Sequence, residues 1–156
     1  MQVLLVQKSI FSYCSFITGC CMLISRKTME TIELIDESYF MYIEDLDYCY
    51  RAKKAGIKMA VLHKSKIWHK TFSVDDLENK REKNVQYFSF AVYWATKNRI
   101  KFISNNFSGF PKVLLLFFFL VSKLFTIFKY LLKNRKDISI AQIKGLRDGL
   151  KECILK

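Results

Sequence analysis

A long apolar stretch near the carboxyl end limits what this chain can fold into. Val113–Val121 is continuously apolar, but Ser122 and Lys123 interrupt it well before the length of about 20 residues that a membrane-spanning helix requires. From there, polar residues recur every three or four positions, at Ser122, Thr126, Lys129 and Lys133. That spacing predicts a helix with one apolar and one polar face, and Pro111 suits its first residue.

The positive charge of the chain is concentrated in the same region. The net charge is +12, and residues 96–156 hold thirteen Lys and Arg against three acids, whereas residues 1–95 hold thirteen against eleven. A basic, aromatic-rich amphipathic helix typically lies among lipid headgroups. The basic residues at its ends, which could contact anionic lipid, are Lys112, Lys133, Arg135 and Lys136.

We therefore expect a membrane surface as a partner for this helix. A tilted membrane span and packing on a protein core remain alternatives. A nucleic-acid-binding face needs charge and stacking groups but no continuous apolar ridge, and the sequence contains no recognisable nucleic-acid-binding motif. We expect no nucleic-acid partner.

The cysteines and the first residues indicate the cellular compartment in which the protein is expected. The five cysteines form no Cys-x-x-Cys pair and match no zinc or disulfide framework. The first residues lack the basic and apolar regions of a signal peptide. We expect reduced thiols and a cytoplasmic location, peripheral on the inner face of the cell membrane.

The first half of the chain predicts short strands that alternate with helices. Residues 3–6 and 20–24 are apolar runs typical of strands, and residues 27–32 suit a short helix. Residues 57–62 suit another strand, and one more ends near Trp68. The sequence therefore predicts an α/β arrangement here.

The clearest helix is predicted at residues 44–55, where three acids open the segment, three basic residues close it and a glycine follows. Glu44, Asp45 and Asp47 lie in its first turn. A carboxylate there stays ionised and can accept a proton from an alcohol as a general base. Acids are also common in first turns simply because they stabilise the helix. Arg51, four residues after Asp47, is spaced to pair with it.

Downstream, the sequence predicts helices only. A first helix, capped by Ser73 or Asp75, runs to about Ile103. A last helix spans about residues 140–154, with Ser139 as its cap.

Two histidines, His63 and His69, are the only imidazoles in the chain. Neither has a second histidine four residues away, as a zinc-binding helix would have. Spacing alone therefore leaves a structural role open for both.

Three motifs follow one another in residues 18–73: TGCCMLIS, DESYFMYIEDLDYCYRAKKAG and IWHK. They resemble the second half of family 2 glycosyltransferases, especially the rhamnosyltransferase-like members that build bacterial surface polysaccharides. The matching residues are Gly19, Cys21, Met22, Leu23, Ile24, Asp36, Glu37, Phe40, Met41, Tyr42, Glu44, Asp45, Asp47, Cys49, Arg51, Ala55, Gly56, Trp68, His69 and Ser73. The later stretches YFSFAVYWATKNRIKFI and KGLRDGL are also similar to elements of the family.

The resemblance implies a fold class and an activity. The fold is α/β: a partial GT-A-type (nucleotide-diphospho-sugar transferase) fold, its acceptor-side half, in residues 1–73. An α-helical amphipathic tail follows in residues 74–156. The implied reaction is inverting transfer of a sugar from a nucleotide-sugar donor to a glycan or lipid-linked acceptor during synthesis of cell-surface polysaccharide, such as lipopolysaccharide or capsule.

The resemblance also implies roles for residues of the acidic cluster. Asp45 would be the catalytic base that deprotonates the acceptor hydroxyl. Glu44 and Asp47 would position the acceptor or the base. Arg51 would support Asp47.

Two further residues gain roles in the same way. Gly19 would let the backbone approach the donor sugar closely. His69 would help to hold the divalent metal ion, Mg²⁺ or Mn²⁺, that offsets charge on the diphosphate.

The sequence also departs from the family pattern. Lys70 replaces a usual histidine, and His63 stands where proline is common, which indicates a structural role for His63. The Asp-x-Asp motif of the nucleotide-binding half has no counterpart outside Asp45-Leu46-Asp47. We therefore expect a chain that does not hold the metal ion alone and that needs an upstream chain carrying the donor half. The alternative is a truncated, non-catalytic remnant that only associates with membrane.

Overall fold

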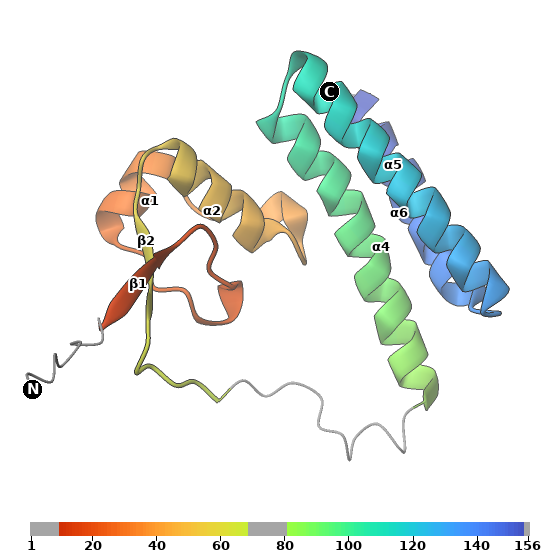
Figure 1. The fold of residues 1–156 in the computed structure, drawn as a ribbon, viewed down its shortest axis with the longest axis horizontal. Coiled ribbons are helices and arrows are strands. Elements are labelled where there is room, and N and C mark those ends of the chain that lie inside the picture. Colours follow the sequence, from red (N-terminus) through yellow and green to blue (C-terminus); the bar gives the residue numbers. More distant parts are fainter. Residues whose placement is uncertain (1–9, 69–80, 155–156) are drawn as a thin grey trace, which may run out of the picture. The chain divides into compact units, whose positions relative to one another are not determined.

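The computed structural model describes residues 10–68 and 81–154 and divides into two compact units (Figure 1). The mixed unit contains the described residues up to Glu37 together with Glu44–Trp68. The helical unit contains Ser38–Ile43 and the described residues from Arg81 onward. A small antiparallel sheet in one unit and long helices in the other thus make up the fold.

The mixed unit is built on a two-stranded antiparallel sheet. Strand β1 (Phe11–Cys14) pairs with β2 (Met59–Leu62), with Phe11 opposite Leu62. Two helices accompany the sheet, α1 (Arg26–Ile32) and α2 (Glu44–Lys54), and two short 3-10 turns, η1 (Gly19–Cys21) and η2 (Glu37–Tyr39), lie in the connections.

Helices α1 and α2 confirm the sequence-based prediction, and their ends show why. The hydroxyl of Ser25 accepts a hydrogen bond of 3.2 Å from the Thr28 N–H, which caps the start of α1. Gly56 has a φ of 75°, a conformation that glycine adopts at little cost, and it ends the segment that contains α2.

The strand predicted at residues 20–24 is wrong. This segment forms η1 followed by extended backbone without a strand partner among the described residues. The N–H groups of Ile17 and Gly19, just before it, donate to side chains of α2, so the loop is held against a helix. The short strand predicted before Trp68 is also absent from the described residues. Strand β1 was not predicted from the sequence. The strand predicted at residues 3–6 lies outside the described residues.

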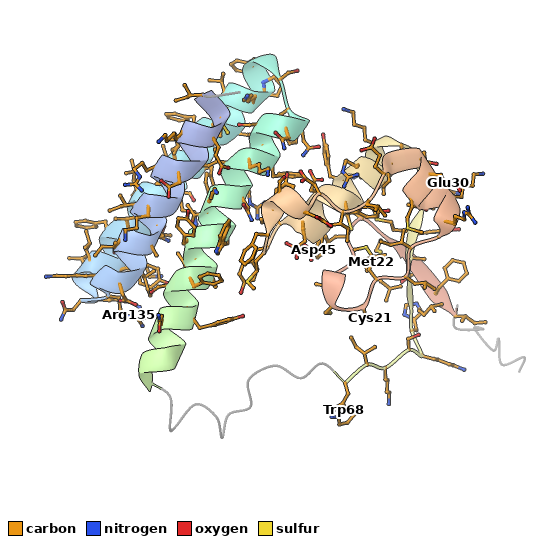
Figure 2. The ribbon with its side chains drawn as sticks, turned by 180° about the vertical axis from the view of Figure 1, so that it is seen from behind. Cys21, Met22, Glu30, Asp45, Trp68 and Arg135 are labelled. Atoms are coloured by element: carbon orange, nitrogen blue, oxygen red, sulfur yellow. The ribbon has the colours of Figure 1, made fainter. Side chains whose placement is uncertain are left out.

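The helical unit contains three long helices: α4 (Arg81–Asn106), α5 (Gly109–Leu132) and α6 (Lys136–Ile154). Helices α4 and α6 pack against each other, as Figure 2 shows from behind. Glycines on α6 permit this approach, because a Cβ atom at Gly145 would lie 2.7 Å from the Tyr93 carbonyl oxygen. At Gly149 a Cβ atom would lie 3.0 Å from the Lys97 carbonyl oxygen.

Two predicted helix starts differ from the structure. Helix α5 begins at Gly109, two residues before Pro111. Helix α6 begins at Lys136, so Ser139 does not cap it: its buried hydroxyl donates to the Ile127 carbonyl oxygen at 3.2 Å and ties α6 to α5. A serine that caps and a serine that joins two helices look the same in a sequence.

Candidate functional site

Asp45 lies in the first turn of α2, at the end of the helix where partial positive charge accumulates. Its carboxylate accepts two main-chain hydrogen bonds: Oδ2 accepts from the Gly19 N–H at 3.1 Å and Oδ1 from the Leu46 N–H at 2.8 Å. In Figure 2, Asp45 is labelled at one end of α2, near the loop that contains Cys21. The carboxylate is therefore held in one orientation while remaining partly exposed.

Gly19 lies beside this carboxylate. A Cβ atom at Gly19 would lie 3.4 Å from the Cβ of Asp45 and 3.8 Å from its Oδ2. A larger side chain would extend into the space beside the carboxylate. The approach of Gly19 to the donor sugar stays a prediction, and the sequence gives no sign of its contact with Asp45.

Asp47 and Arg51 form the ion pair that their spacing predicts, with 2.8 Å between Arg51 Nε and Asp47 Oδ2. The Asp47 side chain is only 6% exposed and that of Arg51 25%. Arg51 also donates to the carbonyl oxygens of Ile32 and Leu34, the latter at 3.0 Å, and lies over the ring of Tyr48. This pair thus fixes α2 to the segment that follows α1.

Glu44 precedes Asp45 and is partly buried. Its Oε2 atom is inaccessible to solvent and has no hydrogen-bond partner among the described residues. A buried carboxylate oxygen without a partner is costly and calls for an explanation.

Cys49, one turn after Asp45, completes the support of the site. Its buried thiol accepts from the Ile17 N–H at 3.3 Å and lies 3.5 Å from the Ile17 carbonyl oxygen as a donor. Burial, chiefly, raises the pKa of the Cys49 thiol; the negative charges of Asp45 and Cys14 add to this, and the Ile17 hydrogen bond opposes it. A neutral thiol thus links the loop before Gly19 to α2.

A small cavity lies behind this loop. It has a volume of about 130 Å³ and a mixed polar and apolar lining that includes Met22, Thr28, Tyr48 and Cys49. Pockets for drug-sized ligands measure about 300–1,000 Å³. The cavity is therefore too small for a nucleotide-sugar.

The predicted metal ligand, His69, lies outside the described residues. Within residues 10–68 and 81–154 there is no group of three His, Cys, Asp or Glu residues that could hold a metal ion. One carboxylate of the acidic cluster, Asp47, is already paired with Arg51. The described residues therefore do not form a metal site by themselves.

A partly exposed carboxylate held by N–H groups at the start of α2 is able to accept a proton from an alcohol. Residues 1–89 match the family described as Glycosyltransferase like family 2, and the chain belongs to this family. It is also 32% identical over 89 residues to the low-salt glycan biosynthesis hexosyltransferase Agl10 of Haloferax volcanii.

That match covers 56% of this chain and 25% of the relative, so the matched segment spans about a quarter of the length of the curated relative. No solved structure matches the chain significantly. The comparisons support sugar transfer as the activity of the family.

Proposed function

We propose that this chain forms the acceptor-side half of an inverting, GT-A-type glycosyltransferase in which Asp45 is the general base. One observation carries the proposal: the Asp45 carboxylate is held by the Gly19 and Leu46 N–H groups at the start of α2 and stays partly exposed. The family to which the chain belongs supports it.

In the proposed reaction, an acceptor hydroxyl binds beside Asp45 and gives its proton to the carboxylate. The acceptor oxygen then forms a bond to the anomeric carbon of the sugar as the bond from that carbon to the nucleotide diphosphate breaks. Attack from the opposite side inverts the configuration. Removing the proton as this bond forms typically contributes about 10²–10⁴ in rate.

The neighbouring residues position these groups. Glu44, next to Asp45, would help to position the acceptor or the base. The Asp47–Arg51 pair holds α2, and with it Asp45, in place. Gly19 leaves room beside the carboxylate for the reacting sugar.

The substrates we propose are a nucleotide-sugar donor and a glycan or lipid-linked acceptor used in cell-surface glycan synthesis. The matching hexosyltransferase is named for glycan biosynthesis, which supports this class. A rhamnosyl or other hexosyl donor, His69 as a ligand of Mg²⁺ or Mn²⁺, and an upstream chain that supplies the donor half are parts of the proposal.

We further propose that the helical unit attaches the enzyme to the cytoplasmic surface of the membrane. Helix α5 is long and apolar enough to cross a bilayer by length and composition, and none of its most apolar 18-residue window is buried. Its exposed apolar side chains include Phe117, Phe125 and Phe128. A membrane surface would cover them and would place the enzyme beside a lipid-linked acceptor.

The test is sugar transfer with UDP-, dTDP- and GDP-sugars in the presence of Mg²⁺ or Mn²⁺. The chain is assayed alone and with any chain encoded immediately upstream, beside an Asp45→Asn variant. We expect turnover with the upstream chain and a loss of about 10²–10⁴ in the Asp45→Asn variant. Glu30→Gln, which changes an exposed acid on α1, is the matched control and should retain full activity.

A second candidate function is a non-catalytic, membrane-associated protein. The exposed apolar surface of α5 favours it, because membrane attachment needs none of the acidic residues of α2. Folded protein that binds vesicles but transfers no sugar with any donor or companion chain would establish this alternative.

A further inference from the structure

A second cavity, unrelated to Asp45, lies within the helical unit at the end where α4 finishes and α5 begins. Its volume is about 460 Å³, within the range of about 300–1,000 Å³ for small-molecule pockets. Its lining comes from all three helices and from the segment before α2: Ser38, Lys101, Ser104, Asn105, Lys112, Glu152 and Cys153.

The chemistry of this lining suits an anion. Lys101 is only 8% exposed, its ammonium group bonds to the Ser38 hydroxyl, and it lies 4.8 Å from the centre of the Tyr39 ring. Lys112 reaches the cavity from the first turns of α5 and has no ion-pair partner among the described residues. The one carboxylate in the lining, Glu152, is paired with Lys97 at 2.5 Å.

Two further donors point to the same ligand class. The Ser104 hydroxyl is inaccessible to solvent and lacks a hydrogen-bond partner among the residues described. Ser108, at the N-cap of α5, makes no side-chain capping hydrogen bond, so the first N–H groups of this helix lack that partner. The start of a helix favours phosphate groups. The carboxyl ends of α4 and α6 carry partial negative charge, which disfavours an anion. The positive charges of Lys101 and Lys112 offset it.

The surface of α5 beside the cavity is apolar. Phe110 is 75% exposed and Val113 65%, and both lie within one turn of Lys112. The chain carries no acid between Gly109 and Lys136, where six basic residues occur. Positive charge beside an exposed apolar helix complements a molecule that has an anionic head and a hydrocarbon chain.

We propose that this cavity binds the terminal phosphate of a lipid whose hydrocarbon chain lies against the exposed face of α5. Lys101, Lys112 and Ser104 contact the phosphate oxygens, and Phe110 and Val113 contact the chain. The inference rests on the membrane attachment proposed above but not on sugar transfer.

The test compares two sets of phosphatidylcholine vesicles matched in zeta potential. One set contains phosphatidic acid, which carries a terminal phosphate, and the other contains oleate, which carries a carboxylate. We expect the wild-type chain to bind phosphatidic acid vesicles about tenfold more tightly, as a few charge-assisted hydrogen bonds would provide. Binding is measured by co-sedimentation.

Two variants and a control locate the effect. Lys112→Gln and Ser104→Ala should bring the phosphate-to-carboxylate ratio close to one while circular dichroism shows intact helices. Lys133→Gln removes an equivalent charge from the other end of α5, outside the cavity. It should weaken binding to both vesicle types equally and leave the ratio unchanged.

The outcomes separate this inference from the proposed attachment. A wild-type ratio of one, or a ratio that survives in Lys112→Gln and Ser104→Ala, would overturn the phosphate site. Absence of binding to either vesicle type would instead overturn membrane attachment.

A calorimetric titration with inorganic phosphate, without vesicles, tests whether the cavity takes a lipid phosphate or a free phosphate. Inorganic phosphate could bind as tightly as phosphatidic acid vesicles do, and this affinity could stay unchanged when Phe110 and Val113 are replaced by serine. That result would assign the site to a soluble phosphate and refute the lipid. Weak binding of inorganic phosphate supports it.

Discussion

The side-chain amide of Asn98 on α4 donates to the main-chain carbonyl oxygen of Tyr39 at 2.5 Å, across 59 residues of sequence. The same nitrogen lies 2.7 Å from the Met41 carbonyl oxygen and 3.0 Å from that of Tyr42. Asn98 and Tyr39 are both completely buried. The segment they hold contains residues with positive φ, Phe40 at 59° and Tyr42 at 64°, which a side chain makes unfavourable.

Asn98→Ala should therefore destabilise the protein by about 1–3 kcal/mol, because it removes the donor that the Tyr39, Met41 and Tyr42 carbonyl oxygens share. Urea unfolding followed by circular dichroism measures the change. Asn106→Ala is the control: this side chain bonds to the Phe102 carbonyl oxygen in its own helix, and its loss should cost about 1 kcal/mol or less. Equal losses in the two variants would contradict the role given to Asn98.

Gly19→Val should lower sugar transfer, assayed with the companion chain, by roughly tenfold or more. The new side chain extends into the space beside Asp45, since a Cβ alone already lies 3.4 Å from the Asp45 Cβ. Gly56→Ala serves as the control. Its φ of 75° makes alanine unfavourable by about 1 kcal/mol, but nothing lies within 4 Å of the added Cβ. That variant should lose stability and keep its activity per folded molecule.

Arg51→Met should cost about 3–5 kcal/mol of stability, because it leaves the Asp47 carboxylate buried without its cation. A matched variant, Arg26→Met, breaks a pair of the same spacing with Glu30. Those side chains are 90% and 64% exposed, so the loss there should be below about 1 kcal/mol. A thermal denaturation series on both variants decides the matter, and similar melting temperatures would show that the Asp47 pair does not hold α2.

Acid should destabilise the helical unit. Hydrogen bonds from Arg135, chiefly, and from Ser89 hold the pKa of Asp137 below its ordinary value of 3.8. Arg147, chiefly, and Tyr93 do the same for the pKa of Asp148. A carboxyl whose pKa is lower in the folded state stabilises that state above its ordinary pKa and loses the contribution as pH falls through the lowered value.

The urea midpoint should accordingly fall between pH 7 and about pH 3, and the double variant Asp137→Asn with Asp148→Asn should show a smaller fall. Both aspartates are mostly shielded and receive hydrogen bonds from α4, at 3.1 Å from Ser89 and 3.0 Å from Tyr93. An identical pH dependence in wild type and double variant would show that these bonds do not carry the effect.

The sequence predicts α2 and its acidic first turn well because every signal there is local. The charge order, the spacing of Asp47 and Arg51, and Gly56 all lie within thirteen residues of one another, and the structure contains the expected pair. The role of Asp45 as base stays a prediction, as does His69, which lies outside the described residues.

Long-range partners explain what sequence reasoning missed. Nothing near Asn98 reveals that its amide holds carbonyl groups some 59 residues earlier, and nothing near Gly19 reveals Asp45, 26 residues later. The helix predicted to begin at Ile140 begins at Lys136, and Ser139, predicted as its cap, bonds to α5. A tertiary contact decides each of these cases, and no window of neighbouring residues contains it.

The hold of Asn98 on the segment before α2 also has a consequence during synthesis. Ser38–Ile43 leaves the ribosome long before α4 exists, since 59 residues separate Tyr39 from Asn98. At about 5–20 residues per second, the segment waits roughly 3–12 s for its partner. Its consecutive aromatic residues, Tyr39 and Phe40, are a natural target for a chaperone during that interval, and a slower ribosome would lengthen it.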